Sequence, residues 1–108
     1  MIFIYTTCKD AAEAKKLGKL IVEKRLAGCV NVWPIESMYW WQEKSEKQEK
    51  IVEDKEVVLL IKTLQQKVSQ IEELILKNHS YAVPCIATIF VDRVNQNYKE
   101  WLNKCVEL

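Results

Sequence analysis

Hydrophobic residues follow two different periodic patterns in the first part of the chain. Residues 2–7 are β-branched or aromatic throughout, which predicts a strand. Apolar residues then recur at helical spacing, and Asp10 and Glu13 have the spacing of a capping box, so a helix should begin after Asp10. We expect this helix to run to about Ala27, with Gly28 as its C-terminal stop.

The middle of the chain has the pattern of a long β-hairpin with a charged tip. Strand character returns over residues 29–33 and ends at Pro34, and the aromatic run 37–41 also suits a strand. Residues 55–63 form a clear strand with an apolar centre. Between these runs, residues 42–50 are all polar or charged, which is typical of a solvated loop.

The last third of the chain repeats the order of helix and strand. Thr63 and Gln66 again have capping-box spacing, and an apolar stripe at helical spacing follows them, so a second helix should end near Asn78. Residues 84–91 predict a strand, which tolerates a proline at its start. Asn95 can cap a short final helix.

This order of elements predicts an α+β fold, a ferredoxin-like βαββαβ sandwich with an extended β-hairpin and a short C-terminal helix, in one domain over residues 1–108. Right-handed crossovers place the first and third strands in the middle, with the first antiparallel to both neighbours. Residues 57–61 are all aliphatic, so both faces of the third strand are apolar. Two helices cover only one face of a sheet, and we therefore expect another subunit on the other face.

Composition narrows the classes of partner. Sixteen basic residues nearly cancel fifteen acidic ones in a chain of 108 residues, so we expect no nucleic-acid partner.

The apolar N-terminal run is too short for a signal peptide or a membrane span, so we expect a cytoplasmic protein without membrane contact. The cysteines form no Cys-x-x-Cys pair and should be thiols: Cys8, Cys29, Cys85 and Cys105.

Five segments, in this order, together resemble the CutA family of divalent-cation tolerance proteins: RLAGCVNVWP, SMYWW, EDKEVVLLIKT, HSYAVP and YKEWL. The resemblance covers almost the whole chain. It implies the ferredoxin-like fold, a homotrimer joined partly by long hairpins, and a role in tolerance of copper or other divalent metals. The chain departs from the family pattern at Ser80, where a proline is usual, at Cys85, where an acidic residue is frequent, and in a hairpin tip that looks several residues longer.

Metal binding, with copper as the ion, is the first functional hypothesis. The resemblance maps a histidine ligand onto His79 and a frequent acidic ligand onto Cys85, and a thiolate at Cys85 favours softer ions such as Cu(I). The predicted topology adds Cys8, because the first strand ends at the sheet edge where the last strand begins. So few ligands do not complete a tetrahedral metal site. The alternative to a metal-binding role is a structural one, in which His79 is a loop residue that forms hydrogen bonds with the backbone.

Binding of a small effector is the second hypothesis, because the trimer of this family resembles that of the PII signalling proteins. By family analogy Lys62, Tyr81 and Trp41 would line a cleft between subunits, and Lys62 would attract a small anion. The alternative for the aromatic residues is interface packing, and a scaffolding role is also open. We expect no enzymatic activity. Cys85 and His79 are the only conceivable pair of nucleophile and base, and no acidic residue has a matching spacing from which it could orient the base.

Overall fold

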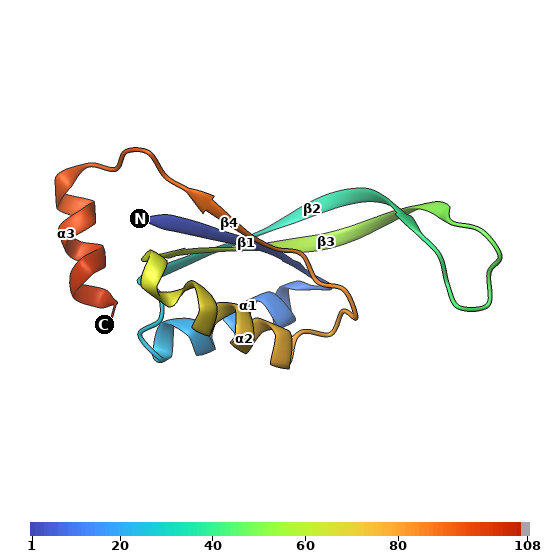
Figure 1. Cartoon of the computed structure of the whole chain (residues 1–108), viewed down its shortest axis with the longest axis horizontal. Helices are drawn as coiled ribbons and strands as arrows, with labels where there is room; N and C mark the ends of the chain where they lie inside the picture. The colour runs from blue at the N-terminus through green and yellow to red at the C-terminus, as the bar shows by residue number, and fades with distance from the viewer. Residues whose placement is uncertain (107–108) are drawn as a thin grey trace.

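The structure, a computed structural model, describes residues 1–106 (Figure 1). In this part of the chain the strands are β1 (Ile2–Cys8), β2 (Cys29–Trp41), β3 (Lys50–Thr63) and β4 (Ile86–Phe90). The helices are α1 (Ala11–Glu23), the 3-10 helix η1 (Gln65–Lys67), α2 (Val68–Asn78) and α3 (Gln96–Cys105). No helix among these is long and apolar enough to cross a membrane.

The strands form one antiparallel sheet in the order β2-β3-β1-β4. β1 and β3 lie in the middle, and β1 is antiparallel to both neighbours, which confirms the predicted ferredoxin-like α+β fold. α1 and α2 lie together on one face of the sheet, and the β2–β3 hairpin projects far beyond them (Figure 1). α3 lies at the other end of the sheet, so the hairpin gives the molecule its length, with extents of 52 × 25 × 21 Å.

The start of α1 is the one that the sequence predicts. The Asp10 carboxylate accepts a hydrogen bond of 2.8 Å from the backbone N–H of Glu13. The Glu13 carboxylate reaches back and accepts one of 3.1 Å from the backbone N–H of Lys9. This reciprocal capping fixes the first turn of the helix against the end of β1, and it directs the Glu13 side chain toward that strand.

The end of α1 differs from the prediction that it runs to Ala27 and stops at Gly28. The helix ends at Glu23, and Arg25 adopts the left-handed conformation, with φ 60°. The backbone N–H groups of Arg25 and Leu26 then bond to carbonyls of the last turn, at 3.0 and 3.1 Å. This is the hydrogen-bond pattern of a Schellman motif, here closed by an arginine instead of a glycine.

Both glycines of the chain allow a helix to approach its neighbours closely. A Cβ atom on Gly28 would lie 2.7 Å from Cδ1 of Leu102 in α3, which is closer than side chains tolerate. A Cβ atom on Gly18 in α1 would lie 3.0 Å from Cγ2 of Val30 and 3.1 Å from Cδ1 of Leu59. Gly28 therefore lets α3 pack closely against the residue before β2, and Gly18 lets α1 pack closely against the sheet.

The hairpin strands are longer than predicted. β2 continues through Pro34, where we expected a strand to end, and Pro34 lies in register with Val57 of β3. Because β2 is an edge strand, a residue without a backbone N–H can be accommodated on its outer side. β3 begins at Lys50 instead of Lys55, so paired strands include part of the charged segment.

Thr63 does not cap α2, contrary to the capping-box prediction. It is the last residue of β3, it is wholly buried, and its hydroxyl donates a hydrogen bond to the backbone carbonyl of Leu26. The chain enters α2 through η1, and no side chain caps either element. Asn95 occupies the predicted N-cap of α3 but makes no capping bond with its side chain, and β4 is shorter than predicted.

The sheet has one covered face and one open face. Side chains of β1 alternate between buried and half-buried, and the buried ones face α1 and α2. Ile61 and Leu59 of β3 lie opposite Ile4 and Thr6 of β1 and are likewise wholly buried. Ile89, on the open face, keeps 45% of its surface exposed. The apolar open face agrees with the expectation that two helices leave one side of the sheet uncovered.

Candidate functional site

Residues 79–85 connect α2 to β4 and pass beside the C-terminal end of β1. Because alternate residues of a strand point to opposite faces, this end of β1 directs Cys8 to the helix side and Thr7 to the open side. The loop supplies residues to both sides. His79 lies near Cys8, whereas Tyr81 and Cys85 line a pocket together with Thr7.

Three potential metal ligands, Cys8, Glu13 and His79, meet on the helix side and are called the Cys8 cluster below. Their sulfur, carboxylate oxygen and imidazole nitrogen lie within 4.8 Å of one another. Cys8 is wholly buried, and the other two residues are half-buried. β1, α1 and the α2–β4 loop supply one residue each, so the fold assembles this cluster from distant parts of the sequence.

Both ring nitrogens of His79 make hydrogen bonds to the backbone. The N–H of Tyr81 donates to Nδ1 at 3.0 Å, and Nε2 lies 2.8 Å from the carbonyl oxygen of Thr7. A backbone N–H can only donate and a carbonyl can only accept, so Nδ1 is unprotonated and Nε2 carries the proton. The neutral imidazole thus ties the loop to β1, which is the structural role that the sequence left as the alternative.

Glu13 joins the start of α1 to the same loop. One carboxylate oxygen accepts from the backbone N–H of Lys9, and the other accepts from the backbone N–H of Ser80 at 2.9 Å. Partial burial acts to raise the pKa of Glu13, but the hydrogen bonds from Ser80 and Lys9 outweigh it and leave the pKa below its ordinary value. Glu13 is therefore an anion at neutral pH, directed toward the cluster.

The Cys8 thiol is held in its protonated form. Burial raises its pKa to about 12, and the negative charges of Glu13, Asp10 and Glu56 act in the same direction. A thiol of this kind is a weak nucleophile, because the thiolate is the reactive species. The cluster is consequently poorly suited to nucleophilic catalysis by Cys8.

The chemistry of the Cys8 cluster fits a thiophilic or borderline cation. Sulfur and imidazole nitrogen are ligands that zinc and copper accept, and magnesium and calcium disfavour. With bonds of about 2.0–2.3 Å, ligand atoms around a tetrahedral ion lie roughly 3.3–3.8 Å apart, so the side chains would have to close by about 1 Å. Binding would also displace the Cys8 proton and one hydrogen bond of His79.

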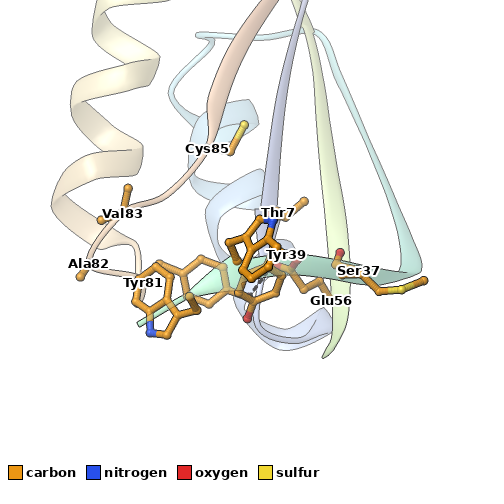
Figure 2. A pocket seen from close by; sticks show the side chains of 11 residues that line it. Thr7, Ser37, Tyr39, Glu56, Tyr81, Ala82, Val83 and Cys85 are labelled. Carbon is orange, nitrogen blue, oxygen red and sulfur yellow. Dashed lines mark hydrogen bonds between the residues drawn. The ribbon is translucent and has the colours of Figure 1, made fainter. Parts of the chain in front are cut away.

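A pocket of about 510 Å³ lies on the open side, between the base of the hairpin and the α2–β4 loop, and is called the aromatic pocket below. Figure 2 shows the side chains of Glu56 and Tyr81 meeting there, with Cys85 set apart from them. The Tyr81 hydroxyl donates a hydrogen bond of 2.8 Å to Oε2 of Glu56. The lining residues are Thr7, Ser37, Met38, Tyr39, Trp40, Trp41, Glu56, Tyr81, Ala82, Val83 and Cys85.

Negative charge dominates the aromatic pocket. Glu56 is only 9% exposed, and it is the one charged residue among the described residues that line the pocket. Burial raises the pKa of Tyr81, and the hydrogen bond to Glu56 and its charge raise it further. The pKa of Tyr39 is also raised, by desolvation and by its hydrogen bond to Asp54. The tyrosines therefore stay neutral beside carboxylates.

Of the metal ligands proposed from the sequence, the structure brings Cys8 and His79 together and places Cys85 elsewhere. Cys85 precedes β4, whose pairing with β1 puts Ile86 opposite Thr6. Continuing that register, Cys85 falls opposite Thr7 and on the open side, and it is exposed. Cys8 and Cys85 thus belong to opposite faces of the sheet.

Of the ligand-binding residues proposed from the sequence, Tyr81 and Trp41 line the aromatic pocket and Lys62 does not. The ammonium group of Lys62 lies 6.0 Å from the ring centre of Phe3 and 5.6 Å from that of Tyr98. Within one subunit, then, the positive charge proposed for an anion lies apart from the proposed aromatic wall.

Sequence reasoning missed Glu13 and Glu56 as members of these two sites. For Glu13 a signal existed, because a capping-box residue points back toward the preceding strand, where Cys8 lies. Glu56 gave no comparable signal. It stands among other charged residues of the hairpin, and only the long-range contact with Tyr81 distinguishes it.

Comparison with known proteins gives a consistent result over almost the whole chain. Residues 2–105 match the family model described as CutA1 divalent ion tolerance protein. The divalent-cation tolerance protein CutA of Archaeoglobus fulgidus is 34% identical over 105 residues, which are 97% of each chain. That of Pyrococcus horikoshii is 39% identical over 102 residues, which are 94% of each chain.

Solved structures agree with these sequence relatives. The crystal structure of CutA1 from Pyrococcus horikoshii matches with a TM-score of 0.90 at 36% identity and covers 100% of both chains. A structure described as the periplasmic divalent cation tolerance protein CutA from Archaeoglobus fulgidus has a TM-score of 0.90 at 34% identity. It covers 99% of this chain and 100% of its own.

Proposed function

Because the chain belongs to the CutA1 family of divalent ion tolerance proteins, we propose that it contributes to cation tolerance by binding copper, without catalysing a reaction. The proposed site is the Cys8 cluster, in which Glu13, and not Cys85, accompanies Cys8 and His79. The observation that carries the proposal is the close approach of these three ligand atoms, within 4.8 Å of one another.

The hydrogen bonds of the cluster support binding that responds to the supply of metal. With no ion, Cys8 keeps its proton and His79 and Glu13 bond to the backbone. A cation has to displace that proton, so its affinity should rise with pH. The carboxylate of Glu13 offsets part of the charge of the incoming ion. Such a site would bind copper when it is abundant and return to a stable metal-free state otherwise.

The proposal includes a homotrimer in the cytoplasm. The open face of the sheet leaves large apolar side chains partly exposed, among them Trp33 and Ile89, and such a surface favours association with further copies of the chain. The cysteines are free thiols, a state that a reducing compartment maintains. Light scattering should give the mass of three chains at micromolar concentration, and a monomer would contradict this part of the proposal.

Competition with a chromogenic Cu(I) chelator, under anaerobic and reducing conditions, tests the site. We expect Cys8→Ala and His79→Ala each to weaken Cu(I) binding by about 100-fold or more, because each removes a direct ligand. Cys85→Ala is the matched control, since Cys85 is an exposed thiol on the other face.

Circular dichroism should first establish that each variant is folded. If Cys85→Ala weakens binding while Cys8→Ala does not, the ligand is Cys85, the thiol indicated by the family resemblance, and the Cys8 cluster is not the copper site. If no variant changes the affinity, copper binding is not located at either place.

A further inference from the structure

The aromatic pocket combines features that suit a positively charged organic molecule. Its volume of about 510 Å³ falls within the range of roughly 300–1,000 Å³ that small-molecule sites occupy. Aromatic rings from the hairpin and from the loop form its walls, and Tyr39 and Trp41 meet edge to face, with ring centres 6.4 Å apart. The pocket therefore offers apolar stacking surfaces together with one fixed negative charge.

Glu56 is placed to receive a cation. The Tyr81 hydroxyl bonds to Oε2, and among the described contacts none engages Oε1. Because Glu56 is largely buried, its charge is screened less than that of a surface carboxylate. No lysine, arginine or histidine lines the pocket within the described part of the chain.

We propose that the aromatic pocket binds a small organic ammonium ion, with its charge beside Glu56 and its hydrocarbon part against Trp41 and Tyr81. Aromatic faces attract such cations through their quadrupoles, most strongly when the cation is partly removed from water. An anion would meet the carboxylate of Glu56 without a positive partner. A bare metal ion would lack ligands along the apolar walls formed by residues such as Met38 and Val83.

This binding is separate from copper binding, because the Cys8 cluster lies on the opposite side of the end of β1. Thr7 lines the aromatic pocket and Cys8 belongs to the cluster. A failure of copper binding therefore leaves this proposal standing, and Cys8→Ala should not change the affinity for an organic cation. The pocket lies on the open side of the sheet, so the proposal requires that the trimer proposed above leaves the pocket accessible.

Isothermal titration of the metal-free protein with three probes that share a phenyl ring and differ in charge tests the proposed charge preference. The probes are benzyltrimethylammonium, benzyl alcohol and benzoate. We expect saturable binding of the ammonium, weaker binding of the alcohol and the weakest binding of benzoate. The reverse order would overturn the proposal and favour an anion site. If the ammonium shows no saturable binding up to about 10 mM, the proposal is also overturned. This holds whether the pocket has no affinity for the cation or a second copy of the chain covers it.

Two substitutions locate the binding. Glu56→Gln should weaken ammonium binding by about tenfold or more, because it removes the charge and keeps the shape. Glu36→Gln is the matched control, because Glu36 is an exposed hairpin carboxylate outside the pocket. Trp41→Leu should also weaken binding, and it keeps the test decisive if Glu56→Gln fails to fold. Equal affinity in Trp41→Leu and the unsubstituted protein would contradict the proposed location.

Discussion

The Cys8 cluster and the aromatic pocket share one loop and one strand end, yet they differ in nearly every physical property. The cluster lies on the helix side, where Cys8 is wholly buried and the polar groups of Glu13 and His79 bond to the backbone. The pocket lies on the open side and is walled by aromatic side chains around Glu56. The alternation of β1 separates the two, because neighbouring residues Thr7 and Cys8 point to opposite faces.

The difference shows how one connection can supply residues to two sites of different construction. On the helix side, His79 holds the loop in place, and a metal ion must compete with existing hydrogen bonds. On the open side, Tyr81 and Cys85 are held by that anchored loop and face a space that is already formed. We therefore expect changes in the cluster to affect stability as well as binding, and changes in the pocket to affect mainly binding.

The reactivity of the thiols should show the largest contrast between the two sides. With a pKa of about 12, roughly one Cys8 thiol in ten thousand is ionised at pH 8, whereas an ordinary thiol is ionised to about a tenth or more. Under Ellman's reagent, we expect exposed Cys85 to react at least about 1,000-fold faster than buried Cys8. Single-cysteine variants identify each rate, and the unfolded protein in guanidinium is the control. Equal rates in the folded protein would contradict the burial of Cys8.

The covered face should carry most of the folding free energy. Leu59→Ala removes a wholly buried side chain on the covered face of β3 and should lower the free energy of unfolding by about 2–5 kcal/mol. Ile51→Ala, in the hairpin, is the matched control, because Ile51 is 61% exposed, and it should cost less than about 1 kcal/mol. Urea denaturation measures both values. A larger effect at Ile51 would mean that the hairpin, and not the covered face, stabilises the fold.

The anchoring role of His79 should be visible without any metal. In the presence of a chelator, His79→Ala should lower the free energy of unfolding by about 1–3 kcal/mol, because it leaves the Thr7 carbonyl and the Tyr81 N–H without a partner. Asn78→Ala is the control, since it removes only an exposed side-chain bond to the Leu74 carbonyl. If both substitutions have the same small effect, the histidine does not hold the loop.

A smaller effect should follow from Thr6, two residues before Cys8 on the same face. Its hydroxyl is wholly buried and has no hydrogen-bond partner among the described residues. Thr6→Val keeps the shape and removes the unpaired group, so it should raise the free energy of unfolding by about 1 kcal/mol. Thr7→Val, on the open side, should give no such gain. Destabilisation by Thr6→Val in urea denaturation would show that the hydroxyl does have a partner in solution.

Much of the fold could be predicted because hydrophobic periodicity can be read from neighbouring residues, and because the handedness of crossover connections follows a general rule. The order of the strands follows from them, and the Asp10 cap of α1 follows from the capping-box spacing of Asp10 and Glu13. The stop of α1 could not be predicted from Gly28, because Arg25 accepts the left-handed conformation and Gly28 serves a contact with α3. The strand end predicted at Pro34 was wrong for a related reason. Whether a proline interrupts a strand depends on the position of that strand in the sheet, and β2 is an edge strand.

The candidate sites were harder to predict than the fold, because they depend on which face a side chain takes. Topology placed Cys8 and the start of β4 at one sheet edge, but the strand register then assigned Cys8 and Cys85 to different faces. Lys62 and Tyr81 were associated by family analogy, and the length of β3 separates them within one subunit. Glu13 joins the cluster because the contact that caps α1 also directs its carboxylate toward the end of β1, where Cys8 lies. The sequence prediction did not include this second effect of the capping box.

The most direct test of the central claim is X-ray absorption spectroscopy of the Cu(I)-loaded protein. We predict sulfur together with nitrogen or oxygen around copper, in a spectrum that Cys85→Ala leaves unchanged and that loses its sulfur contribution in Cys8→Ala. A sulfur contribution that persists in Cys8→Ala and disappears in Cys85→Ala would contradict the Cys8 cluster as the metal site.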